Sequence, residues 1–135
     1  MKLIVCLDDQ NGMLFNGRRL SMDSAVRRRI LEITYNKTLW MNRYSANQFA
    51  SMDCDPNVDE NFLYKAGMNE YCFLENTDVY AHMGAVEELI VYRWNRRYPS
   101  DRVFPMEAFC SWKKVSSTDF MGNSHEKLTE EVYLP

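Results

Sequence analysis

The first 49 residues constrain the fold more than any other part of the chain. Residues 1–7 are apolar except for Lys2, and a polar loop with two Asn-Gly pairs leads from them to Asp23. Apolar side chains then recur at helical spacing over residues 23–35, and a second short apolar run follows at 38–41. Continuous apolar runs are typical of strands buried on both faces. This order predicts a strand, a turn-rich loop, an amphipathic helix and a second buried strand.

The composition fits one soluble domain. The chain has 135 residues, 46% of them hydrophobic, which is enough to build a core. No apolar run reaches the roughly 18 residues of a membrane span, and the N-terminal run is too short for a signal peptide, so we expect a cytoplasmic protein. A net charge of −3 argues against general nucleic-acid binding. The four cysteines lie far apart and no histidine stands at ligand spacing from one, so we expect reduced thiols and no metal.

The remaining chain continues to alternate between strands and helices. Strands are predicted at residues 2–7, 38–41, 70–74, 88–94, 112–116 and 131–134, and helices at 23–35, 46–49, 57–67 and 79–83. Helices between strands imply right-handed crossovers and a mainly parallel sheet covered on both faces, while the last two strands can pair antiparallel at one edge. We therefore expect a single three-layer α/β domain over residues 1–135.

Five segments, taken in order, resemble the dihydrofolate reductase family. LIVCLDDQNGMLFNGRRLSMD is similar to its opening strand, its mobile active-site loop and the acidic residue that begins its first helix. KTLWMNRYSANQF is similar to its second strand and the Gly-Arg-x-Thr helix start, and VDENFLYKAGMNEYCFLENTDVYAHM to a later helix, strand and Gly-Gly-x-x-Tyr helix start. ELIVYRWNRRYPSDRVFP resembles its late strand and turn, and the tail from Ser111 resembles its terminal hairpin.

One block of that family is absent here. Between the segments that match Phe49 and Asn57, the family has a longer stretch that includes a strand, and this chain has only SMDCDP. The resemblance therefore implies a mixed, mainly parallel sheet with an antiparallel C-terminal hairpin, lacking about one strand and part of the nucleotide side.

Asp23 matches the family's acidic catalytic group. The resemblance implies that this carboxylate helps to protonate a pterin ring while NADPH delivers a hydride. Charge-assisted hydrogen bonds from the substrate's amino-pyrimidine edge would also reach it. The plain alternative is an ordinary helix-start aspartate, which the helix dipole favours by about 0.3–1 kcal/mol.

The resemblance also assigns binding residues. It gives substrate contacts to Cys6, Arg18, Arg27 and Tyr92, and NADPH contacts to Arg43, Tyr44, Ser45, Asn76, Thr77 and Tyr80. A helix start with an arginine is a good anion site. The plain alternatives are a surface arginine beside a capping serine, and a packing tyrosine at position 80.

Several of these positions depart from the family pattern. Glu75 and Asn76 replace a glycine pair that lets the cofactor pyrophosphate approach the backbone. A carboxylate about 4 Å from a phosphate charge repels it by roughly 4 kcal/mol at an effective dielectric near 20. Arg18, Arg27 and Tyr92 replace two aromatic residues and a threonine, which makes the cleft more positive and less apolar.

Two functions follow from these residues. The first is an NADPH-dependent reductase of a pterin or other small heterocycle, with Asp23 as the acidic group. The second is a diverged non-catalytic domain that binds a small anionic ligand or a partner protein through the same cleft. The sheet edge expected at residues 70–74 also suggests a homodimer. The spacing of His82 and His125 suggests no catalytic arrangement, and they read as a helix residue and a turn residue.

Overall fold

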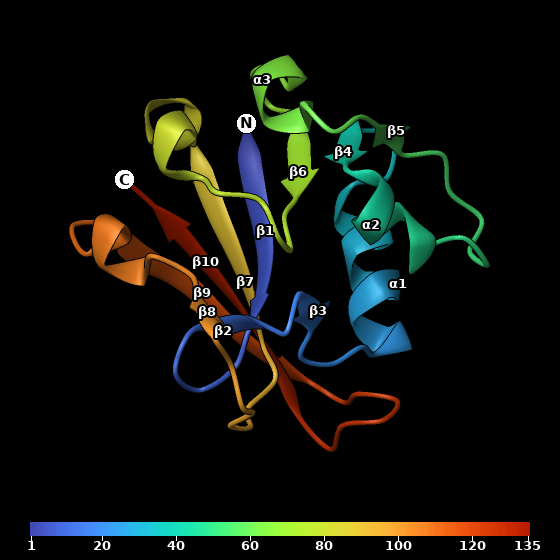
Figure 1. Ribbon diagram of the computed structural model, residues 1–135, viewed down its shortest axis with the longest axis vertical. Helices are drawn as coiled ribbons and strands as arrows, with labels where there is room; N and C mark the ends of the chain where they lie inside the picture. Colours follow the sequence, from blue (N-terminus) through green and yellow to red (C-terminus); the bar gives the residue numbers. More distant parts are fainter.

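A computed structural model describes residues 1–135, and its centre is a seven-stranded sheet in the order β5-β4-β6-β1-β7-β10-β9 (Figure 1). The strands of this sheet are β1 (Lys2–Leu7), β4 (Leu39–Met41), β5 (Asn57–Val58), β6 (Tyr71–Phe73), β7 (Glu88–Arg93), β9 (Lys113–Phe120) and β10 (Leu128–Leu134). The helices are α1 (Ser24–Ile33), α2 (Arg43–Asn47), α3 (Phe62–Lys65) and the 3₁₀ helices η1 (Tyr80–Ala85) and η2 (Met106–Phe109).

The pairing directions confirm the predicted sheet. Strand β1 pairs parallel with β6 and β7, and β4 pairs parallel with β6 and β5. Strand β10 pairs antiparallel with both β7 and β9, which makes the C-terminal hairpin. The chain is thus an α/β domain with a mixed, mainly parallel sheet, and none of its helices is long and apolar enough to cross a bilayer.

Strand β1 separates two apolar clusters because its side chains alternate between the sheet faces. Leu3 belongs to the larger cluster, which also contains residues from α3 and η2 and against which Met83 of η1 packs. Ile4 belongs to the other cluster, where Val26 and Ile30 of α1 pack with Phe49 just after α2. Helices α1 and α2 therefore lie on the same face of the sheet (Figure 1).

The polar loop after β1 forms a second, three-stranded sheet that the sequence pattern did not predict. Strand β2 (Gly12–Phe15) pairs antiparallel with β3 (Arg18–Arg19) and with β8 (Arg102–Val103). The two predicted Asn-Gly turns are present, since Asn11 and Asn16 both have positive φ, at 63° and 51°. Asparagine tolerates this left-handed region better than most residues.

Two sequence-based expectations are wrong. Residues 57–67 are not one helix: Asn57 and Val58 pair with β4 as strand β5, and only α3 is helical. Residues 70–74 are not a sheet edge, because β6 lies between β4 and β1, and the edges are β5 and β9. The structural basis for a homodimer through residues 70–74 is therefore removed, and dimer formation itself stays a prediction.

Candidate functional site

The loop between β9 and β10, residues 121–127, folds over the start of α1 and encloses the Asp23 carboxylate. Asp23 has extended backbone geometry and its side chain accepts a 2.8 Å hydrogen bond from the Ala25 N–H, so it caps α1. The backbone N–H groups of Asn123, Ser124 and His125 donate to the same carboxylate at 2.9–3.1 Å. The Asp23 residue is only 3% exposed.

These donors determine the charge of Asp23. Burial by itself raises the pKa of the carboxyl, but the hydrogen bonds from Asn123, His125, Ala25 and Ser124 together hold its pKa well below the usual range. The group is therefore ionised and accepts hydrogen bonds from its own chain. The prediction that Asp23 protonates a ligand stays untested, and such a contact requires residues 121–127 to move away.

Gly122 allows the loop to approach this closely. A Cβ at this position would lie 2.4 Å from the His125 carbonyl oxygen and 2.7 Å from Asp23 Oδ2. A residue with a Cβ does not fit there unless the neighbouring backbone shifts.

His125 connects Asp23 to two hydroxyl groups. Its Nδ1 lies 2.9 Å from Asp23 Oδ2, while its Nε2 lies 2.9 Å from Ser21 Oγ and 3.1 Å from the Tyr98 hydroxyl. The ring stacks on Trp94 with centroids 4.9 Å apart. Because the ionised carboxylate can only accept, Nδ1 carries a proton, and in the tautomer with this proton alone Nε2 accepts from a hydroxyl.

Sequence reasoning missed this cluster. His125 follows Ser21 by 104 residues and Asp23 by 102, and it reaches both because the terminal hairpin folds back over α1. No local spacing could have indicated a contact of this range. The two aromatic neighbours of the ring are Trp94 and Tyr98, which follow strand β7. Trp94 was predicted as the last residue of a strand over residues 88–94, and Tyr98 in the turn after it.

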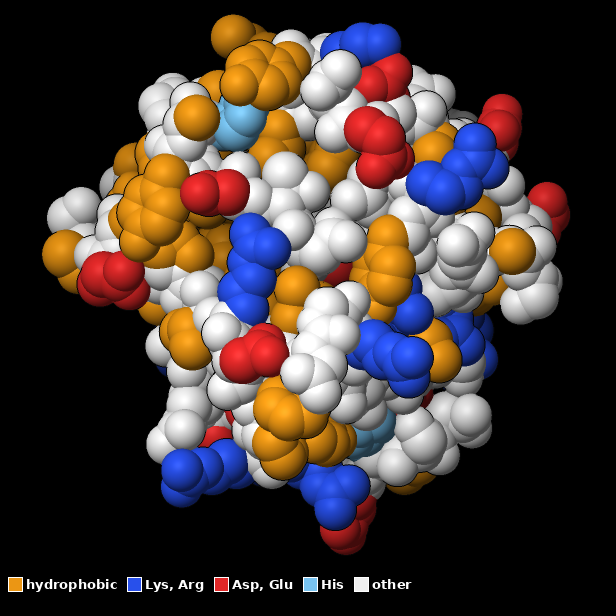
Figure 2. Space-filling view, viewed as in Figure 1, with side chains coloured by type: hydrophobic (Ala, Val, Ile, Leu, Met, Phe, Trp, Pro, Cys, Tyr) orange, Lys and Arg blue, Asp and Glu red, His pale blue; other side chains and the backbone are white.

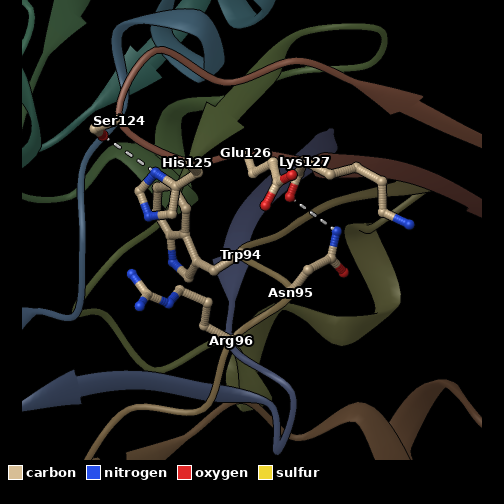
Figure 3. Close-up of a pocket in the computed structure, with 7 residues that line it drawn as sticks. All are labelled: Trp94, Asn95, Arg96, Ser124, His125, Glu126 and Lys127. Atoms are coloured by element: carbon tan, nitrogen blue, oxygen red, sulfur yellow. Dashed lines mark hydrogen bonds between the residues drawn. The ribbon is translucent and has the colours of Figure 1, made fainter.

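A pocket of about 650 Å³ adjoins the His125 ring (Figure 3). Seven residues line it: Trp94, Asn95, Arg96, Ser124, His125, Glu126 and Lys127. Figure 3 shows the Arg96 side chain extending toward the His125 and Trp94 rings. The Asn95 amide is held by the Lys127 carbonyl and the Thr129 hydroxyl, and the Arg96 guanidinium lies 6.0 Å from the Tyr98 ring centroid.

A second carboxylate lies at the position of the family's glycine pair. Glu75 is 8% exposed and faces inward, where Arg19 Nε and Nη2 donate to its two oxygens at 2.8 and 3.0 Å. The Arg19 guanidinium also lies 4.3 Å from the Tyr44 ring centroid, and the Tyr44 hydroxyl accepts the Arg19 backbone N–H. Arg19 therefore occupies this cleft, whereas Arg18, the predicted residue, is exposed.

The start of α2 is also occupied by groups of the chain. The Asn42 side chain accepts from the Ser45 N–H at 3.0 Å and donates to Asn76 Oδ1 at 2.7 Å. Glu60 accepts the backbone N–H of Arg43 at 2.9 Å. Two of the N–H groups that a phosphate would use at this helix start, those of Arg43 and Ser45, thus already have partners.

The other predicted cofactor residues lie in different surroundings. Thr77 is 3.5 Å from the Asn42 amide, so it stays beside the predicted group. Tyr80 lies apart from it: its ring is 58% exposed and its hydroxyl donates to Glu107.

Beneath α1, the predicted substrate residue Tyr92 is fully buried and donates a 2.7 Å hydrogen bond to Glu130. Glu130 in turn accepts two bonds from Arg29. Burial, with Glu130 as the neighbouring charge, raises the pKa of Tyr92. Burial also raises the pKa of the Cys6 thiol. The charge of Glu75 raises this pKa further, and the charge of Arg19 lowers it. Cys6 is therefore a neutral thiol close to the Glu75–Arg19 pair.

Two buried side-chain polar atoms have no hydrogen-bond partner, and both belong to residues that the sequence assigned to ligand binding. They are Nε of Arg27 and Oγ of Ser45. A buried donor without a partner costs about 1–3 kcal/mol and is rare in folded proteins. Arg19, Arg29 and Arg93, by contrast, each pair with a glutamate.

Charge on the surface is mixed. Figure 2 shows Lys and Arg side chains at several separate places on the visible face, with Asp and Glu between them. This face has no single broad basic surface of the kind that tracks a nucleic-acid backbone.

Comparison with known proteins supports the fold and leaves the sequence family open. No protein-family model matches the chain, and no curated protein matches it either. A solved dihydrofolate reductase from Enterococcus faecalis, in complex with NADP(H) and RAB-propyl, matches with a TM-score of 0.69 and 14% identity. The alignment covers 98% of this chain and 94% of the reductase.

Proposed function

Starting from its dihydrofolate reductase-like fold, we propose that this chain is a diverged binding protein for a small anionic ligand, and that it transfers no hydride. The observation that carries this proposal is the buried, unpartnered Nε of Arg27. Arg27 lies one helical turn after Asp23, so both residues project from the same side of α1. An anion beside Arg27 would satisfy the buried donor and offset the cost of leaving it unpaired.

The same geometry disfavours NADPH. Glu75 holds Arg19, and Glu60 holds the Arg43 N–H, so carboxylates of the chain occupy donors that a cofactor's phosphates would need. A cofactor phosphate would have to displace Glu75 from Arg19 before it could pair with that guanidinium.

The reductase remains the second candidate, because the matching solved structure is an NADP(H) complex. This candidate uses Asp23 as the acidic group and NADPH as cofactor, and it requires both Glu75 and residues 121–127 to move. A partner protein that binds the same cleft is a further prediction of the binding proposal.

The first experiment measures thermal unfolding with inorganic phosphate, sulfate or citrate. We expect at least one of these anions to stabilise the protein, by about 2.7 kcal/mol at a hundred times its dissociation constant. Arg27→Met should abolish the stabilisation, and Arg28→Met, which removes an exposed arginine from the same helix, should preserve it. Equal stabilisation of both variants would contradict binding at Arg27.

The second experiment separates binding protein from reductase. Titration with NADPH, followed by energy transfer from tryptophan, should give no saturable signal up to millimolar cofactor. Saturable binding together with dihydrofolate turnover that is lost in Asp23→Asn would instead establish the reductase.

A further inference from the structure

We propose that Ser21 is a nucleophile, activated by His125 and oriented by Asp23, that accepts the acyl group of a small carboxylic ester bound in the pocket beside Trp94. This goes beyond anion binding at Arg27 and does not depend on it. The array consists of a hydroxyl 2.9 Å from Nε2 of an imidazole whose Nδ1 lies 2.9 Å from a buried carboxylate. Those are the distances over which a base can take a proton from a nucleophile.

Each group is in the state that this role needs. Asp23 is ionised and held by several backbone N–H groups, so it fixes the ring orientation and leaves the proton on Nδ1. In the tautomer that carries only this proton, Nε2 presents its lone pair to Ser21. Stacking on Trp94 restricts the ring further, with an interplanar angle of 26°.

A purely structural role explains part of the cluster and leaves part unexplained. The loop backbone alone supplies donors to Asp23, and Tyr98 alone could satisfy Nε2. The Ser21 hydroxyl is a second hydroxyl beside His125 Nε2, which has only one lone pair to accept with. Ser21 is a partly exposed loop residue. The His125 ring also borders a pocket of about 650 Å³, large enough for a small substrate. Ser21 is not one of the seven residues that line this pocket, so the ester must extend past the His125 ring to reach Ser21 Oγ.

The pocket indicates the class of ester. Arg96 and Lys127 line it with one opposing acid, Glu126. Lys127 is 3.8 Å from Asp119, and in Figure 3 the Arg96 side chain extends toward the His125 ring while that of Lys127 extends away from it. We therefore expect an ester of a small acid that carries a negative charge, with the guanidinium of Arg96 pairing with that charge.

The reaction balances without any cofactor. Ser21 Oγ forms a bond to the carbonyl carbon while its proton passes to Nε2 of His125. The bond from that carbon to the leaving oxygen breaks, and the leaving alkoxide takes the proton from Nε2. Water then attacks the acyl-Ser21 ester, gives its proton to Nε2, and the serine oxygen leaves and recovers that proton. The products are one carboxylic acid and one alcohol.

The test is covalent labelling with a fluorophosphonate, in which Ser21 Oγ displaces fluoride from phosphorus. Intact-mass measurement and peptide mapping should find one adduct, on Ser21. Ser21→Ala should lose it, and His125→Gln should slow it by about a hundredfold or more, because general-base assistance contributes 10²–10⁴-fold. Ser24→Ala should keep it, because the Ser24 hydroxyl bonds Arg28 rather than His125.

The folding of the variants is checked by circular dichroism, because His125 also supports the loop over Asp23. If His125→Gln does not fold, the wild type is compared with the same protein in urea, where an activated serine loses its reactivity. Absence of an adduct on Ser21 in the folded wild type, or equal labelling in urea, would overturn the proposal. Neither result affects anion binding at Arg27, which Arg27→Met tests separately.

Discussion

At the residue scale, two carboxylates determine how this site differs from its expected form. Asp23 was predicted to lie at a helix start, and it does, but its oxygens are held by residues that follow it by about 100 positions. Glu75 was expected to obstruct a phosphate, and it is instead paired with Arg19. The sequence could reveal the two acids from local order. It could not reveal their partners, because those partners are brought in by tertiary folding.

The Asp23→Asn variant tests the charge on the first carboxylate. We expect a loss of about 3 kcal/mol of unfolding free energy at pH 7, because an amide nitrogen would face N–H donors. Since the pKa of Asp23 is lowered in the fold, its stabilisation is complete above the unfolded-state pKa, about 3.9, and shrinks as the pH falls below that value. Urea unfolding at pH 7 and pH 3 should show a smaller difference between wild type and variant at pH 3.

The exposed Asp9→Asn is the matched control, because it removes the same charge from the surface. It should change stability little at either pH. A difference for Asp23→Asn that stays constant between pH 7 and pH 3 would contradict the lowered pKa.

The Glu75→Gln variant tests the second carboxylate. Arg19 would lose a bidentate partner in a partly buried site, so we expect a loss of about 1–3 kcal/mol. Inorganic phosphate should then stabilise this variant more than the wild type, because it can pair with the freed guanidinium. Melting temperatures with and without phosphate measure this, and Glu32→Gln, an exposed acid, should show no extra effect.

At the element scale, length decided which elements could be predicted. Strands β1 and β7 and helix α1 have six to ten residues and clear apolar patterns, and all three were predicted. Strand β5 has two residues and α3 has four, so backbone pairing with β4 outweighs any local preference. The loop over residues 121–127 has no repeating pattern, and its conformation depends on Asp23 beneath it.

The Gly122→Ala variant tests that loop. Its methyl group would collide with the His125 carbonyl and with Asp23 Oδ2, so we expect a loss of about 1–3 kcal/mol. Gly84→Ala is the matched control, because a methyl group there meets no atom within 4 Å. Equal stability of the two variants in urea would mean that the loop does not enclose Asp23.

At the scale of the whole molecule, the fold prediction rested on the order of strands and helices along the chain. Alternating buried strands and helices led to a mainly parallel sheet, and the sheet order agrees. The second sheet and the interior position of β6 were not predicted, because they depend on which distant strands pair. Both apolar clusters share β1, so the molecule should unfold as one unit.

The Leu3→Ala and Ile4→Ala variants test this cooperativity. Both side chains are fully buried, on opposite faces of β1, and each truncation should cost about 2–5 kcal/mol. Fluorescence and circular dichroism should report the same single midpoint in each variant. Separate midpoints for the two probes would show that the faces unfold independently.

The Glu75–Arg19 pair has a consequence for any outside ligand. Glu75 is attached to the protein, so it competes for Arg19 at a fixed, high effective concentration that dilution cannot lower. A free phosphate at ordinary cellular levels must displace the Glu75 carboxylate before it can contact the Arg19 guanidinium. Arg19 is therefore selective through internal competition: a ligand that contacts this guanidinium must make several contacts at once, whereas Arg27 has no such competing carboxylate.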